Sequence, residues 1–230
     1  REFPDLQKKM QCIKYKGAMT VDVWRILVVY RFGGIYSDID NVPPKFFQNG
    51  TMINPDDTFF ATLDTYQRPL QNTFAMEPQH PIAVFTMETI LKNLMAMESL
   101  RKPKTVFVTG PQALFEGCTK YTGAGGCNKA GIHIGKFLSK KVHLETMIAG
   151  QGWGNPMNGE LVEYEGRNLT KKEVSLHLGG LRHWEKVKFK NKVGKDFSCR
   201  EYLYRVDHPS KENAITGNWS LNEEYAFGVT

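Results

Sequence analysis

Two aspartates separated by one residue, Asp38 and Asp40, are the clearest sign of chemistry in this sequence. They follow the short run Gly34-Ile35-Tyr36-Ser37, which is typical of a β-strand, and a bend after it would aim both carboxylates at one point. Two anions held that close repel each other unless a cation lies between them. A hard divalent cation prefers oxygen ligands and keeps positions for phosphate oxygens. The spacing therefore predicts a metal site at Asp38 and Asp40, with a solvated turn as the plainer alternative.

A second pair of charges precedes these aspartates. Asp22 and Arg25 are the only charged residues in the apolar stretch 21–30, and a spacing of three places them on one face of a helix. Charges in an apolar helix are costly unless they are paired, so they contact each other or a ligand. One interpretation is a structural salt bridge. The other is that Arg25 reaches a sugar or phosphate, while Asp22 fixes Arg25 or accepts a sugar hydroxyl.

The elements around these residues can be predicted from pattern. Residues 21–32 form an expected helix with Thr20 as its cap and Gly33 as its end. This helix is apolar almost all round, which is typical of a buried helix. The run Val42-Pro43-Pro44 cannot continue a strand ladder, so the chain should turn there.

Further strands and helices alternate along the chain. We expect strands at 58–63, 73–76, 105–108, 142–147 and 186–195, and helices within 1–16, at 81–97 and from Gln112. This alternation favours an α/β fold with a largely parallel sheet.

Composition limits the classes of protein that fit. The chain has 230 residues, of which 41% are hydrophobic, and contains 14 Phe, 9 Tyr and 4 Trp, as expected for a folded globular protein. The sequence contains no run of about eighteen apolar residues, the length that a membrane-spanning helix needs. The net charge of +6 suits phosphate-bearing ligands. The sequence has no Arg-rich run with interleaved aromatic residues, so nucleic acid is not predicted as a partner.

The four cysteines contain no CxxC pair, which argues against a zinc site. Cys118 and Cys127 lie in the Gly-rich segment 117–131, where a disulfide could close a short loop. Three N-x-S/T sequons, at Asn49, Asn168 and Asn218, together with that disulfide favour a secretory lumen. The alternative is four buried thiols and three chance tripeptides.

The stretch from Val23-Trp24-Arg25-Ile26-Leu27 to Phe32-Gly33-Gly34-Ile35-Tyr36-Ser37-Asp38-Ile39-Asp40 resembles the DXD sugar-nucleotide-binding region of glycosyltransferases. It is most similar to glycosyltransferase family 32, which includes Golgi α-1,6-mannosyltransferases and the mannosyltransferases of inositol phosphorylceramide. Its Asp-x-x-Arg also resembles large clostridial glucosylating toxins. The resemblance implies one GT-A-type nucleotide-diphospho-sugar transferase domain over 1–230, with a central, mostly parallel sheet flanked by helices.

The same resemblance implies roles for individual residues. Asp40 would bind Mn²⁺ or Mg²⁺ directly, and Asp38 would contact the ribose or the metal through water. Arg25 and Asp22 would hold the donor sugar, and Tyr36 would pack near the nucleotide.

Later segments resemble the family more weakly, and the first of them, from Asn72-Thr73-Phe74 to His80-Pro81, is similar to the part before its second main helix. Thr109-Gly110-Pro111 is similar to a strand end near the acceptor side, within a DXD core of 20–120 that precedes an acceptor-side part of 121–230. His177 and Trp184 are similar to the segment that closes over the diphosphate, where the usual Gly-Ser-Trp is replaced by Arg182-His183-Trp184.

The implied activity is the transfer of a hexose to a glycan or glycolipid with retention of the anomeric configuration. The implied hexose is mannose, and its donor is GDP-mannose. The leaving diphosphate would help to deprotonate the acceptor. Members act in the lumen of the Golgi or ER, held by a membrane anchor that these residues do not contain. Only thirty-seven residues precede Asp38, so we expect an incomplete N-terminal strand–helix unit and a missing part of the base pocket.

Two rival functions fit parts of the pattern. Asp38-Ile39-Asp40-Asn41-Val42 is similar to the start of haloacid-dehalogenase phosphatases, in which the first aspartate is the nucleophile. That fold needs a longer apolar strand before the motif and a distant acidic pair. The second rival is a non-catalytic domain that binds a sugar nucleotide without turnover.

Overall fold

The structure is a computed structural model that describes residues 3–14, 16–38, 53–64, 66–146, 162–164, 167–169 and 197–208. Its helices are α1 (Pro4–Met10), the 3₁₀ turn η1 (Gln11–Ile13), α2 (Gly17–Phe32), α4 (Pro81–Ala96), α5 (Thr105–Val108), α6 (Pro111–Thr122) and α8 (Cys199–Asp207). Its strands are β1 (Gly34–Ser37), β2 (Phe59–Leu63), β3 (Pro69–Met76), β4 (Gly131–Ile134), β5 (Lys141–Thr146), β6 (Val162–Tyr164) and β7 (Arg167–Leu169).

Five of the described strands form one sheet in the order β1-β3-β2-β5-β4, and β6 pairs with β7 separately. The α/β class is confirmed, and a sheet packed against helices is compatible with a GT-A-type fold. The strand directions differ from the mostly parallel sheet that was expected, because within this sheet only β2 and β5 pair in parallel. Short links explain this result: residues 64–68 join β2 to β3 and residues 135–140 join β4 to β5, and links of this length connect antiparallel neighbours.

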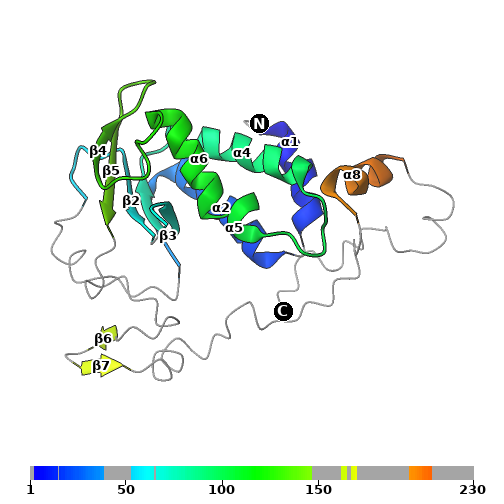
Figure 1. Cartoon of the computed structure of the whole chain (residues 1–230), viewed down its shortest axis with the longest axis horizontal. Helices are drawn as coiled ribbons and strands as arrows, with labels where there is room; N and C mark the ends of the chain where they lie inside the picture. The colour runs from blue at the N-terminus through cyan, green and yellow to red at the C-terminus, as the bar shows by residue number, and fades with distance from the viewer. Residues whose placement is uncertain are drawn as a thin grey trace.

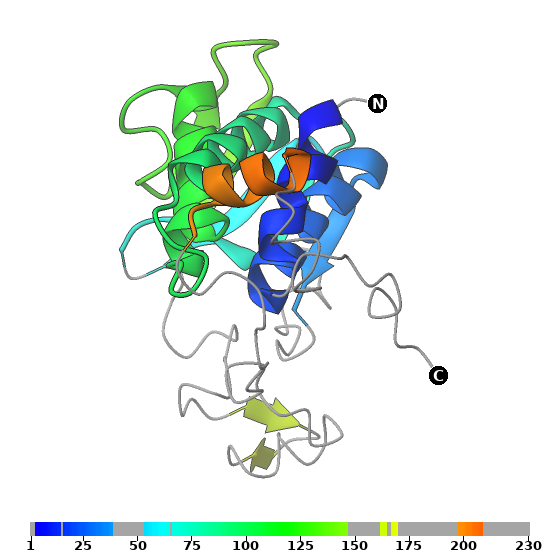
Figure 2. The ribbon, with the colours of Figure 1, turned by 90° about the vertical axis from the view of Figure 1, so that its right-hand side faces the viewer.

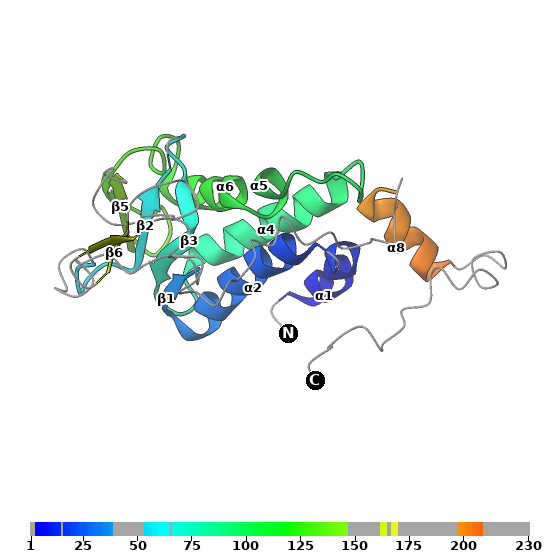
Figure 3. The same ribbon diagram turned by 90° about the horizontal axis from the view of Figure 1, so that it is seen from below.

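The main helices lie together on one side of the sheet. Figures 1 and 2 show α2, α4 and α6 on the same side, and Figure 3 shows α4 between the other two. The core between the layers contains buried apolar side chains from both: Ile26, Val29, Phe59, Ala61, Phe74, Ile82, Met87, Ile90, Leu114 and Val142. Strand residues alternate between the two faces of a sheet, so Phe59 and Ala61 enter this core while Phe60, although buried, lies outside it.

Helix α2 ends where the sequence predicts but begins earlier. It starts at Gly17 rather than at Val21, and the hydroxyl of Thr20 donates to the Ile13 carbonyl instead of capping the helix. Gly33 ends it with φ +69, a left-handed conformation that glycine adopts without strain.

The prediction that α2 is buried all round is wrong. Val21 is 40% exposed and Trp24 is 55% exposed, whereas Asp22 and Arg25 are buried. The helix therefore turns Asp22 and Arg25 inward, while three of its apolar residues, Val21, Trp24 and Phe32, are exposed.

The remaining predicted elements had mixed outcomes. The strands at 58–63, 73–76 and 142–147 and the helices within 1–16, at 81–97 and from Gln112 are confirmed within a few residues. The strand predicted at 105–108 is wrong, because these residues form the single helical turn α5. A run of four apolar residues is too short for its periodicity to separate a strand from a helix. The strand predicted at 186–195 lies outside the described residues.

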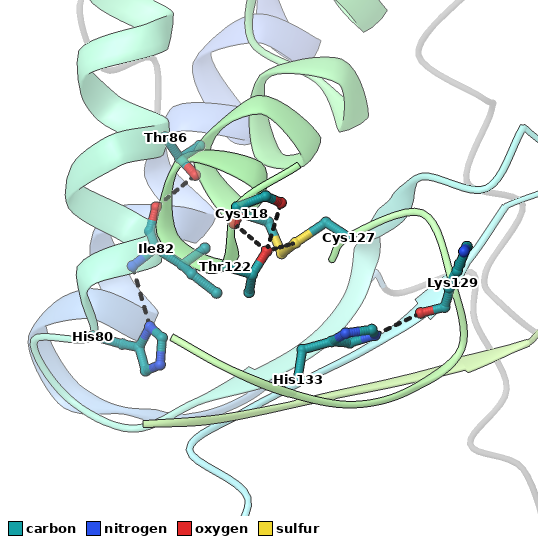
Figure 4. The surroundings of a disulfide bond; sticks show 9 residues. His80, Ile82, Thr86, Cys118, Thr122, Cys127, Lys129 and His133 are labelled. Atoms are coloured by element: carbon teal, nitrogen blue, oxygen red, sulfur yellow. Dashed lines mark hydrogen bonds between the residues drawn. A yellow bond between two sulfur atoms is a disulfide. The ribbon is translucent and has the colours of Figure 1, made fainter. Parts of the chain in front are cut away.

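Both pairs of cysteines form disulfides. The predicted bridge between Cys118 and Cys127 is confirmed, and Figure 4 shows it beside Thr122, whose hydroxyl lies 3.2 Å from the Cys127 sulfur. The second bridge joins Cys12 in η1 to Cys199 at the start of α8. Thus α8, which lies at the end of the helical layer away from the sheet, is covalently linked to the N-terminal helices (Figure 1). None of the described helices is both long and apolar enough to cross a membrane.

Candidate functional site

The predicted DXD stretch begins at the end of β1, and the preceding backbone fixes its first aspartate. The chain leaves α2 at Gly33, whose N–H donates to the Val29 carbonyl at 2.7 Å, and enters β1 directly. β1 pairs with β3 up to Ser37, which lies opposite Thr73. The N–H of Asp38 then donates to the Asn72 carbonyl at 2.7 Å, so its side chain leaves a backbone anchored to the sheet.

The guanidinium of Arg25 lies between two carboxylates. Its Nη2 is 3.3 Å from Oδ1 of Asp22 and 3.4 Å from Oδ1 of Asp38, and its Nη1 donates to the Gln71 carbonyl at 3.0 Å. The side chains of Asp22 and Arg25 are only about a tenth exposed, and that of Asp38 is 28% exposed. One buried cation therefore joins α2 to β3 and to the start of the DXD stretch.

Tyr36 forms an aromatic wall beside this cluster. Its hydroxyl donates to Oδ1 of Asp38 at 2.6 Å, and the guanidinium carbon of Arg25 lies 5.0 Å from its ring centroid. Trp24 packs edge-on against the same ring with centroids 6.4 Å apart. The exposed Trp24 and half-buried Tyr36 thus border the cluster of Asp22, Arg25 and Asp38.

Burial controls the protonation of two of these groups. It raises the pKa of Asp22 to about 6, and the nearby Asp38 charge acts in the same direction, while Arg25 and the Thr109 hydroxyl oppose the rise. The pKa of the Tyr36 hydroxyl is also raised, first by burial and then by its hydrogen bond to Asp38. Tyr36 is therefore a hydrogen-bond donor throughout the physiological range.

Two further residues contact the cluster, and the sequence analysis did not assign them to it. The hydroxyl of Thr109 donates to Oδ2 of Asp22 at 2.8 Å, and the side-chain amide of Gln71 donates to the Thr109 carbonyl at 3.0 Å. Thr109 was expected near the acceptor side, but its hydroxyl contacts Asp22. Gln71 precedes the strand that was predicted from Thr73, so no periodic pattern marked it as buried.

The structure brings together four of the seven predicted site residues: Asp22, Arg25, Tyr36 and Asp38. The other three, Asp40, His177 and Trp184, lie outside the described residues. Within the part that is described, no group of three or more His, Cys, Asp or Glu side chains could hold a metal ion. A metal site at this point therefore depends on Asp40 beside Asp38, whose carboxylate oxygens are the ligand type that Mn²⁺ and Mg²⁺ prefer.

Comparison with known families supports the sequence interpretation. Residues 3–60 match the family model described as "Glycosyltransferase sugar-binding region containing DXD motif". The match covers about a quarter of the chain and contains α1, α2, β1 and both aspartates of the DXD. No curated protein and no solved structure shows significant similarity to this chain.

The match supports a glycosyltransferase, and a DXD region in general implies a divalent metal and a nucleotide sugar as ligands, with an acceptor as the second substrate. The Asp22–Arg25–Asp38 cluster lies within the matched residues.

Proposed function

We propose that this chain is a metal-dependent retaining glycosyltransferase that moves mannose from GDP-mannose to a glycan or glycolipid acceptor. The observation that carries the proposal is the contact of one buried guanidinium with both Asp22 and Asp38, inside the residues that match the DXD family model. A solvated turn would not place the first DXD carboxylate against a buried helix charge.

The reaction breaks the bond between C1 of the sugar and the diphosphate oxygen and forms a bond from C1 to the acceptor hydroxyl oxygen. The acceptor proton passes to the leaving diphosphate. A divalent cation held by Asp38 and Asp40 would neutralise the charge that develops on this diphosphate, which is typically worth several kcal/mol of barrier.

The described side chains supply orientation. Asp22 can accept hydrogen bonds from sugar hydroxyls, and Arg25 can donate to hydroxyl or phosphate oxygens. Tyr36 donates its hydroxyl proton to Asp38 and so fixes the direction of that carboxylate. In this proposal His177 and Trp184 close over the diphosphate.

The lumen of the Golgi or ER is the proposed location. The four cysteines form two disulfides, and disulfides persist in oxidising compartments. The three sequons are consistent with the same compartments.

The described structure adds no support to the phosphatase alternative, which rests on the D-x-D motif alone. β1 has four residues, lies at the edge of the described sheet and pairs antiparallel, whereas the phosphatase motif needs a longer apolar strand before it.

The direct test of the proposed function is transfer from a panel of nucleotide sugars that includes GDP-mannose, with Mn²⁺, by the wild type and by Asp40→Ala. We expect activity that EDTA removes and Mn²⁺ restores, and a variant that keeps the circular dichroism and melting temperature of the wild type but loses transfer. Wild-type turnover in Asp40→Ala, or full activity in EDTA, would contradict the proposal. Binding of Mn²⁺ and nucleotide without transfer or hydrolysis would select the non-catalytic alternative.

A further inference from the structure

We propose that Gln71 and Thr109 are positioning residues that hold Asp22 and Arg25 in the geometry needed to grip the sugar of the donor. The inference rests on the proposed function and adds to it two residues that do not themselves have to touch the substrate. It also connects β3 and the C-terminal end of α5 to a site whose described residues the sequence placed on α2, on β1 and directly after β1.

Four contacts close a ring of side chains and backbone. Asp22 contacts Arg25, and Arg25 donates to the backbone carbonyl of Gln71. The amide of Gln71 donates to the carbonyl of Thr109, whose hydroxyl donates back to Asp22. Each residue therefore limits the position of the next, and the two oxygens of Asp22 have separate partners, Arg25 at Oδ1 and Thr109 at Oδ2.

Every member of this ring is buried, yet two of its polar atoms have no hydrogen-bond partner among the described residues. Gln71 is 1% exposed and Thr109 is 0% exposed, and within the described part of the chain neither Nε of Arg25 nor Oε1 of Gln71 is hydrogen-bonded. An unpaired buried polar atom is costly, and well-packed apolar residues often replace buried ionic groups at no loss of stability. Stability alone is thus a weak reason for a glutamine at this point of β3, and positioning of the charged pair is a better one.

The orientation of the Asp22 carboxylate determines where Arg25 lies relative to Asp38. Without the Thr109 hydroxyl, the Asp22 carboxylate can rotate and draw the guanidinium away from Asp38. The sugar would then be misplaced relative to the bond that breaks, and an error of about 1 Å in such an arrangement can cost on the order of a hundredfold in rate. The nucleoside diphosphate itself would still bind, because in the proposed function Asp22 and Arg25 hold the sugar, whereas the metal at Asp38 and Asp40 holds the diphosphate.

The test compares Thr109→Val, which removes the hydroxyl, with Thr109→Ser, which keeps it. Thr86→Val is the matched control, because Thr86 is equally buried and its hydroxyl donates to Ile82 within α4 (Figure 4), outside the ring. For each variant, kcat and KM are measured with the best donor found for the wild type, and GDP or UDP binding is measured separately by calorimetry. Gln71→Met provides a second break in the ring if Thr109→Val does not fold.

We expect Thr109→Val and Gln71→Met to lower kcat/KM on the order of 10- to 100-fold, while Thr109→Ser and Thr86→Val stay near the wild type. Binding of the free nucleoside diphosphate should be unchanged in all four. If the wild type is active and both Thr109→Val and Gln71→Met keep its full kcat/KM, the positioning role is wrong, while the proposed function stands. A wild type that neither transfers nor hydrolyses any donor would overturn both.

Discussion

The sequence identifies Arg25 as a paired charge in a helix, but it gives only one of the partners that the structure shows. Its spacing from Asp22 predicts a shared helix face, and the structure confirms the contact at 3.3 Å. The third partner, Asp38, comes from beyond the helix, and its distance from Arg25 depends on the turn at Gly33, which spacing alone does not give. Gln71 carried no signal, because a single polar residue in a short apolar segment has no periodic pattern, and Thr109 was marked only by the resemblance of Thr109-Gly110-Pro111 to an acceptor-side segment.

The protonation of Asp22 makes a testable prediction about stability. The folded protein keeps the proton up to about pH 6, whereas the unfolded chain loses it near the ordinary value of 3.8. Between these values the native state binds more protons than the unfolded state, so the free energy of unfolding contributed by Asp22 falls as the pH rises. Arg25 and Asp38 are the charged groups that face Asp22, and burial outweighs the favourable contact with Arg25.

The measurement is urea unfolding of the wild type and Asp22→Asn between about pH 4 and pH 7. Because asparagine cannot ionise, the wild type should lose on the order of 2–3 kcal/mol relative to the variant over this interval. A constant difference between the two proteins across the interval would show that burial does not raise the pKa of Asp22.

At the scale of elements, sequence predicts the junction of α2, Gly33 and β1 residue by residue. Its helix end, its glycine and its four-residue strand all lie where they were expected. The start of α2 was missed because Thr20 offered a plausible cap, while its hydroxyl instead bonds the preceding turn. The exposure of Trp24 was missed because hydrophobicity favours burial but does not require it.

The turn at Gly33 predicts a local effect of substitution. In Gly33→Ala the new Cβ would lie 2.6 Å from Cδ of Pro78, and φ +69 is unfavourable for any residue with a Cβ. The backbone conformation alone should cost at least about 1–2 kcal/mol, which chemical denaturation can measure. Gly17→Ala is the control at the other end of α2, where a Cβ meets nothing within 4 Å.

We expect Gly17→Ala to change stability by less than about 1 kcal/mol, in the stabilising direction. If Gly33→Ala proved as stable as Gly17→Ala, the close approach of the chain to Pro78 at the end of α2 would be refuted.

At the scale of the whole molecule, sequence predicted the α/β class but not the direction of the strands. Alternating elements favour parallel strands, but the short links at 64–68 and 135–140 impose antiparallel pairs. The pairing of Cys12 with Cys199 could not be predicted either, because 187 residues separate them and no local pattern connects them. A single domain over 1–230 stays a prediction.

The two disulfides should differ in their effect on stability. In the chain-entropy model a bridge across 187 residues contributes about 5 kcal/mol, and one across nine residues contributes roughly 2–3 kcal/mol. We therefore expect the double variant Cys12→Ser/Cys199→Ser to be less stable than Cys118→Ser/Cys127→Ser in guanidinium unfolding. Equal stabilities, or free thiols in the unmodified protein by mass spectrometry, would contradict this account of the fold.

The central claim is that the cluster of Asp22, Arg25 and Asp38 holds the sugar of a nucleotide donor. Calorimetric titration of the wild type and Arg25→Lys with GDP-mannose and with GDP, both in Mn²⁺, tests it most directly. Lysine keeps the charge but lacks the planar fork that reaches two carboxylates. The wild type should bind GDP-mannose more tightly than GDP, and Arg25→Lys should bind the two ligands equally. A wild type with no affinity for either ligand, or an Arg25→Lys protein with unchanged preference for the donor, would contradict the claim.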